Sequence, residues 1–166
     1  MTTAEQTTTV QVYRVWIKAT PQAIWDAITD PDWTDRYGYG GRVSFDLRPG
    51  GRFTAGASAA MKAHGTPDVM IEGEVIESDP PRKLVQTWHP IWSEEAAAER
   101  PTRLTYEIAE SENGVTKLTV IHDVEGAPGV AQAVSGQLES TGAGGGWAMV
   151  LSDLKSLLET GSPLFG

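Results

Sequence analysis

The spacing of hydrophobic residues predicts strands at the start and in the middle of the chain and a long helix at its end. Residues 9–18, TVQVYRVWIK, are rich in valine and aromatic residues and predict a strand. A helix should follow, because Thr20 is a suitable N-cap and Pro21 suits the first helical position. Its apolar side chains share one helical face: Ile24, Trp25 and Ile28. Pro31 ends this helix, and residues 30–41 predict a short second helix and a loop.

In the middle of the chain the apolar residues recur at every second position, as they do in a strand with one buried face. This part predicts two β-hairpins, residues 42–58 and 102–124, with two further antiparallel strands between them, residues 68–79 and 82–90. RPGG should form the first hairpin turn, since proline suits its first central position and glycine its second. ENG should form the turn of the second hairpin.

The last fifth of the chain has the period of a helix. Its apolar stripe is formed by Trp147, Leu151, Leu154 and Leu158. Gly161 is suited to end the helix, and residues 128–141 predict one or two helical turns before it. A curved sheet with one buried face needs a cover, and this helix is the only predicted element long enough. We therefore expect an α+β fold.

Composition and charge narrow the function without naming it. The 166 residues suit a single domain, and the net charge of −9 argues against binding to nucleic acid or to anionic lipid. The absence of cysteine excludes disulfides and thiolate chemistry. The first eight residues do not resemble a signal peptide, and no apolar run approaches the length of a membrane span. We therefore expect a cytoplasmic protein with no membrane insertion.

Four stretches of the sequence resemble the START-like (SRPBCC) superfamily. They are ATPQAIWDAITDPD, DLRPGGRF, GEVIESDPPRKLVQTW and GGWAMVLSDLKSLLETG, in the same order. Within the superfamily they are most similar to domains homologous to the activator of the ninety-kilodalton heat-shock chaperone's ATPase. The resemblance covers about residues 10–161. It implies a helix-grip fold, in which a curved antiparallel sheet wraps around a long C-terminal helix with a cavity between them.

On this basis we expect a single START-like domain at residues 9–161, with a flexible N-terminus at residues 1–8 and a tail at residues 162–166. The superfamily includes lipid carriers, polyketide cyclases and plant hormone receptors. A fold with so many functions does not identify the function of one member.

The glycine-rich segment GAGGGW raises the question of phosphate binding. A dinucleotide fingerprint would need a buried strand before the glycines, and a P-loop would need a lysine after them. Neither is present, so we interpret the glycines as places where the backbone approaches the sheet closely or bends before the helix. If these glycines have a function, we expect it to be that of a flexible hinge beside the cavity mouth. The resemblance implies that Trp147 packs as the first anchor of the helix.

Strand parity predicts which side chains face the cavity. The expected pocket residues are Phe45, Phe53, Gln86, Trp88, Tyr106 and His122 from the sheet, with Trp147 and Leu151 from the helix. A mostly apolar wall with a few polar groups is typical of a small-molecule site, whose volume is roughly 300–1,000 Å³. The alternative is that Gln86, Tyr106 and His122 have structural roles and bond to backbone or water near the ends of the sheet.

The remaining histidines and acidic residues give little indication of a catalytic or metal site. His64 lies in a polar loop and His89 has the opposite parity to Trp88, so both are expected outside the pocket. The scattered histidines form no metal-binding motif, and we expect no metal, no cofactor and no conventional catalytic set. The polar segment SEEAAAER is expected to be a solvated helix or loop.

Three functions fit these observations. The first is a binding module for a small apolar or amphipathic molecule. The second is an enzyme of cyclase or hydratase type, in which His122 or Tyr106 moves a proton. The third is a co-chaperone-like regulator of a heat-shock chaperone ATPase, which rests on the resemblance. The protein is expected to be a monomer or a homodimer.

Overall fold

Seven strands form one antiparallel sheet in the order β1-β7-β6-β5-β4-β3-β2. The computed structural model describes residues 9–142 and 144–165, so the expected flexible N-terminus at residues 1–8 lies outside the described residues. The strands are β1 Val10–Ile17, β2 Val43–Phe45, β3 Arg52–Gly56, β4 Val69–Asp79, β5 Lys83–Pro90, β6 Thr102–Glu110 and β7 Thr116–Asp123.

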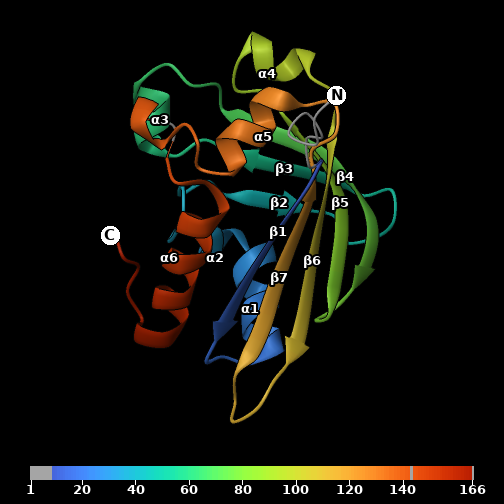
Figure 1. Ribbon diagram of the computed structural model, residues 1–166, viewed down its shortest axis with the longest axis vertical. Helices are drawn as coiled ribbons and strands as arrows, with labels where there is room; N and C mark the ends of the chain where they lie inside the picture. Colours follow the sequence, from blue (N-terminus) through green and yellow to red (C-terminus); the bar gives the residue numbers. More distant parts are fainter. Residues whose placement is uncertain (1–8, 143, 166) are drawn as a thin grey trace, which may run out of the picture.

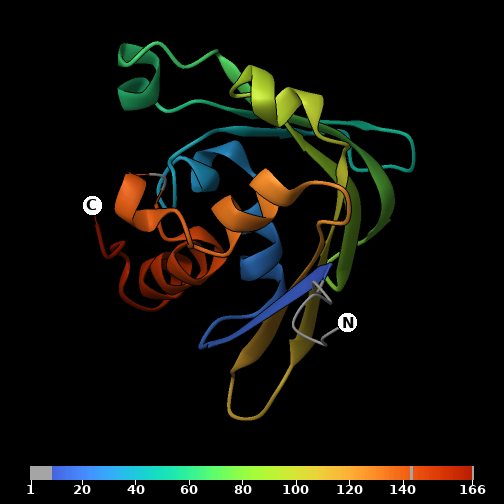
Figure 2. The same cartoon turned by 45° about the horizontal axis from the view of Figure 1, so that its top comes forward.

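The helices lie mainly on one side of this sheet (Figure 1). They are α1 Pro21–Thr29, α2 Pro31–Thr34, α3 Ala59–Ala63, α4 Glu94–Ala98, α5 Pro128–Val134 and α6 Gly146–Thr160, with a 3₁₀ turn, η2, at Glu139–Thr141. Figure 2 shows the sheet curving around α1, α5 and α6. The α+β helix-grip fold expected from the sequence is therefore confirmed.

Local sequence signals form the predicted elements. The Thr20 hydroxyl accepts a hydrogen bond from the Ala23 amide at 3.1 Å, which caps α1. In the RPGG turn, Gly50 has a φ of 84° and the Gly51 amide donates to the Arg48 carbonyl at 2.8 Å. Left-handed backbone of this kind is accessible to glycine without a steric penalty, which explains the turn. The short helix α3 was not predicted from the sequence.

The core forms where the concave face of the sheet meets α1 and α6. Every second residue of the central strands points into it, as the parity predicted, and α1 contributes Ile24, Trp25 and Ile28. Along α6, Leu151, Leu154 and Leu157 are buried. Leu158, which the predicted stripe included, is only half-buried, because the helix turns Leu157 more directly towards the sheet.

Candidate functional site

A cavity of about 590 Å³ lies between the sheet and the helices α4, α5 and α6. Its volume falls within the usual range for small-molecule sites. The wall is mostly apolar, and large side chains from four elements or loops shape it: Trp88, Trp92, Tyr106, Trp147, Val150 and Leu151. Loop residues 37–41, between α2 and β2, close one side.

Four of the expected pocket residues lie in this wall. Trp88 and Tyr106 come from β5 and β6, and Trp147 and Leu151 come from the first half of α6. The rings of Tyr106 and Trp147 meet edge to face with centroids 6.0 Å apart. This contact joins the sheet to the start of α6 at the cavity.

The other four expected pocket residues are not among those that line this cavity. Phe45 and Phe53 are directly opposite each other on β2 and β3, and their rings pack together with centroids 4.7 Å apart. Gln86 is completely buried, and its side-chain oxygen has no hydrogen-bond partner among the described residues. His122 is also completely buried. Phe53, Gln86 and His122 are buried on the face that parity predicted, and Phe45 is half-buried beside Phe53.

His122 lies in a directed chain of hydrogen bonds. The Thr102 hydroxyl donates to the Trp88 carbonyl at 2.6 Å, so its oxygen accepts from Nε2 of His122 at 2.8 Å. Nδ1 of His122 then accepts from the indole Nε1–H of Trp147 at 3.0 Å. These partners assign the neutral tautomer with its proton on Nε2. The chain fastens the first turn of α6 to three strands of the sheet.

This environment makes His122 unsuited to proton transfer near neutral pH. Burial lowers its pKa to about 4, and the neighbouring Asp123 carboxylate opposes that shift only in part. Both ring nitrogens already have partners. Protonating Nδ1 would break the bond from Trp147, so the structure supports the structural role that sequence analysis left open for this residue.

Tyr106 contributes a polar group to the wall. Among the described residues no side chain or backbone group hydrogen-bonds to its hydroxyl. Burial raises its pKa well above the ordinary value, so the phenol is protonated at neutral pH. A protonated hydroxyl in an apolar wall can donate a hydrogen bond to a bound molecule.

Two glycine-rich segments meet at the cavity, around Gly38 and around Gly146. The Gly146 amide donates to the Tyr39 hydroxyl at 3.1 Å. A β-carbon on Gly146 would lie 2.3 Å from the Val134 carbonyl oxygen, and one on Gly144 would lie 2.6 Å from the Tyr39 ring. The glycines therefore permit close approach of the backbone to the end of α5 and to the loop at Tyr39, and these contacts are not with the sheet.

A buried carboxylate, which the sequence analysis missed, holds the loop of residues 37–41. Asp153 of α6 is buried and accepts hydrogen bonds from the amides of Gly38 at 2.8 Å and Leu164 at 2.5 Å. Asp153 lies on the buried side of α6 with Leu154. Its burial was not predicted, because an aspartate is ordinarily exposed. Among the described residues, its partners are one amide 115 residues away in the loop and one 11 residues away in the tail.

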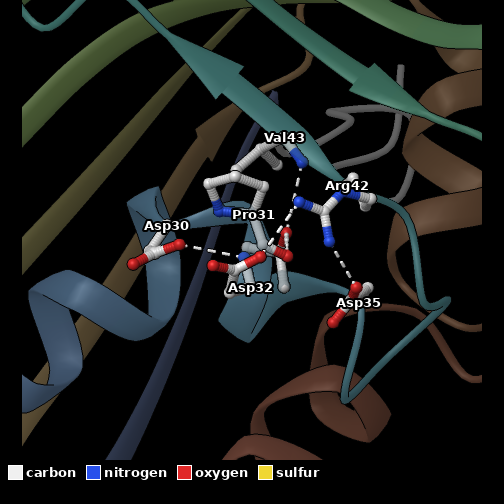
Figure 3. Close-up of polar contacts among 7 residues, drawn as sticks. Asp30, Pro31, Asp32, Asp35, Arg42 and Val43 are labelled. Atoms are coloured by element: carbon white, nitrogen blue, oxygen red, sulfur yellow. Dashed lines mark hydrogen bonds and ion pairs between the residues drawn. The ribbon is translucent and has the colours of Figure 1, made fainter.

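An ion-pair clamp fixes the end of the same loop. The Arg42 guanidinium contacts Asp35 at 2.6 Å and Asp32 at 3.0 Å, and the Thr34 hydroxyl accepts from the Val43 amide at 3.1 Å (Figure 3). The side chains of Arg42 and Asp32 are largely exposed, so the pairs contribute little stability. Their effect is to join α2 to the start of β2, where Val43 lines the cavity.

The segment SEEAAAER forms more of the site than expected. It contains α4, whose N-cap is Ser93, and Glu95, Ala96 and Glu99 lie in the cavity wall. The Glu99 carboxylate accepts from the amides of Gly129 at 2.7 Å and Val130 at 3.0 Å. Serine followed by acidic residues and alanines was the signal for this helix; its position over the cavity had no local signal.

His89 and His64 lie outside the cavity wall, as their parity and context predicted. His89 is nevertheless partnered, because its Nε2 lies 3.1 Å from the Ala97 carbonyl oxygen and 3.0 Å from that of Glu99. It therefore holds the end of α4 in place. In the described part of the chain, no group of three or more His, Asp or Glu side chains is arranged to hold a metal ion. No helix in that part is long and apolar enough to cross a membrane.

Comparison with known proteins identifies relatives at the level of family and fold. The family model for "Activator of Hsp90 ATPase homolog 1-like protein" matches residues 18–159. No curated protein matches the chain significantly.

Several solved structures are similar. CalU16 from Micromonospora echinospora has a TM-score of 0.64 at 19% identity, over 93% of this chain and 76% of that one. The Aha1 dimer from Colwellia psychrerythraea has a TM-score of 0.62 at 18% identity, over 93% and 98%. DynU16, from the dynemicin biosynthetic locus, has a TM-score of 0.67 at 22% identity, over 95% of this chain and 49% of that one. At these identities the likeness establishes the fold.

Proposed function

The chain belongs to the Activator of Hsp90 ATPase homolog 1-like family, and we propose that this member is a cytoplasmic binding protein for a small, mostly apolar molecule. Residues 9–161 would act as one binding unit, with the molecule held between the sheet and α6. Trp88, Tyr106, Trp147 and Leu151 would contact it.

The observation that carries this proposal is the cavity itself. It has a volume of about 590 Å³, is partly open to solvent, and has a mostly apolar wall, which is the usual form of a small-molecule site. An apolar cavity of this kind is a favourable place for apolar surface, and the free hydroxyl of Tyr106 offers one directional contact. DynU16 comes from a biosynthetic locus, which makes small biosynthetic molecules reasonable first candidates.

The residues favour binding over catalysis. His122 is neutral, buried and bonded at both nitrogens, so it is poorly placed to act as a general base. The raised pKa of Tyr106 keeps that hydroxyl protonated at neutral pH, so it can donate a hydrogen bond but is not available to accept a proton as a general base. An enzyme of cyclase or hydratase type would therefore need another proton acceptor, such as a group on the substrate.

The family description favours a second candidate function, regulation of a heat-shock chaperone ATPase. Such a role would use the outer surface and would not require an occupied cavity. The similar structure from Colwellia is a dimer, so a homodimer is a reasonable assembly to test alongside the monomer. Stimulation of chaperone ATPase by the purified protein would support this second candidate.

Native mass spectrometry of the purified protein tests the binding proposal. We expect a co-purifying small molecule in the wild type and its loss in Val150→Trp, which places a large ring in the cavity wall. Ser152→Trp is the matched control, because Ser152 is exposed on the same helix. An adduct that survives Val150→Trp, or a wild type that binds nothing from a library of apolar compounds, would contradict the proposal.

A further inference from the structure

The ionisable residues of the cavity wall are acidic or phenolic. Glu95 and Glu99 are its carboxylates, and among the described wall residues there is no lysine, arginine or histidine. A binding site for a carboxylate, sulfonate or phosphate ordinarily supplies a cationic side chain or free backbone amides. Near this cavity, donors of both kinds have partners within the protein.

Three of the cationic residues that are next to wall residues in the sequence are engaged elsewhere. Arg42 is paired with Asp32 and Asp35. Lys62, next to the wall residue Met61, lies 3.8 Å from Asp68. Arg100 packs over Gly126, where an added β-carbon would lie 2.2 Å from its Cδ, and it lines a separate groove on the protein.

Three backbone amides of the wall are also taken by the protein itself. The Glu99 carboxylate accepts from the first amides of α5, at Gly129 and Val130. At the start of α6, the Gly146 amide donates to the Tyr39 hydroxyl. A carboxylate oxygen of Glu139 lies 3.3 Å from the position of a β-carbon on Gly145, so an acidic group already faces the positive end of the α6 dipole.

The wall has several aromatic rings that can contact the apolar part of a ligand. Trp88 and Trp92 pack edge to face at 6.1 Å, as Tyr106 and Trp147 do at 6.0 Å. Rings already held by edge contacts offer surfaces to a planar ligand without further ordering. The Tyr106 hydroxyl can donate to an oxygen or nitrogen acceptor of that ligand.

Resting on the proposed function, we infer that the cavity selects an uncharged planar aromatic molecule and rejects anionic ones. An anion would lose its hydration without gaining a cationic partner, and it would lie near two carboxylates in a protein of net charge −9. An uncharged aromatic molecule meets neither penalty. The preference for uncharged ligands comes from the charge and polarity of the wall as a whole, and not from one specific contact.

Two fluorescent probes of nearly identical shape test this inference. N-phenyl-1-naphthylamine is uncharged, and 1-anilinonaphthalene-8-sulfonate is the same ring system with one sulfonate. We expect the Kd of the uncharged probe to be at least tenfold lower. Equal affinity, or tighter binding of the sulfonate, would overturn the inference and leave the proposed binding function standing. Binding of neither probe would overturn the proposed function as well.

A pair of variants then separates the wall from overall charge. Glu95→Lys adds a cation at the wall, and Glu94→Lys makes the same change one residue away, in the same helical turn but outside the wall. We expect Glu95→Lys to improve binding of the sulfonate at least threefold more than Glu94→Lys does. Equal effects of the two variants would assign the selection to net charge and overturn the role of the wall. Val150→Trp should abolish binding of the uncharged probe, and retained binding would place the probe outside the cavity and contradict the inference.

Discussion

At the scale of single residues, His122 shows how a polar side chain on the inner face can be structural. Trp147 covers it from α6, Thr102 anchors its Nε2, and Trp88 lies edge-on at 5.0 Å. Each buried polar atom of the ring is satisfied, which is the usual condition for burying a polar group. The expected pocket histidine is therefore a fastening between helix and sheet.

The depressed pKa of His122 predicts a stability that depends on pH. The unfolded imidazole binds a proton below its ordinary pKa of about 6.5, whereas the folded one does so only near 4. The native state is therefore fully favoured above pH 6.5, and the free energy of unfolding should fall by roughly 3 kcal/mol as the pH drops from 6.5 to 4.

Urea unfolding at several pH values measures this dependence, with His122→Gln expected to lower stability and to flatten the curve over that interval. His64→Gln is the control, because His64 is exposed. Ligand affinity should change little in His122→Gln, since the ring does not line the cavity. A wild-type curve that is flat between pH 4 and 6.5 would refute the buried neutral state.

At the scale of elements, α6 is positioned by its buried leucines and by bonds at its ends. Leu154 is 1% exposed and packs in the seam between α6 and the sheet. Asp153 ties the middle of the helix to the loop at Gly38, and Trp147 ties its start to His122. The helix therefore holds one wall of the cavity in a fixed place.

Leu154→Ala tests the packing of this helix. We expect it to lower the free energy of unfolding by about 2–5 kcal/mol, because it removes buried methyl groups and leaves a void. Leu164→Ala is the control, as Leu164 is 57% exposed and should have little effect. Chemical denaturation measures both, and a cost for Leu154→Ala below about half a kcal/mol would show that the buried face is wrongly assigned.

Across the whole molecule, the curvature of the sheet leaves room for a cavity next to its packed core. The seven strands curve around α1, α5 and α6 (Figure 2), and α4 and the loop at residues 37–41 complete the wall. Side chains that line the cavity have fewer contacts than side chains in a packed core, so the protein without ligand lacks some dispersion energy. A ligand that fills the space should therefore stabilise the folded protein.

The uncharged naphthylamine probe measures this stabilisation. At a concentration one hundred times its Kd, it should raise the free energy of unfolding by about 2.7 kcal/mol, because it binds only the folded state. Thermal and chemical unfolding should agree on the size of the effect. Val150→Trp should show no such gain, whereas Ser152→Trp should behave as the wild type.

Local sequence patterns were enough to predict most of the elements and most of the faces that they bury. Thr20 capped its helix, RPGG and ENG formed their turns, and alternation assigned Leu84, Trp88 and Leu104 to the inner face. These features depend on neighbours within a few residues, so local steric and hydrogen-bonding rules suffice to predict them.

Which inner-face residues reach the cavity depends on packing between distant parts of the chain. Parity gives the direction of a side chain and not what lies in front of it, so His122 and Tyr106 looked equivalent in sequence. Trp147, from a distant helix, satisfies and covers His122, whereas nothing bonds to the Tyr106 hydroxyl among the described residues. Burial of Asp153 and the position of α4 over the cavity likewise depend on partners far apart along the chain. Contacts of this range have no local signal, because they form only when the sheet curves and its covering helices dock.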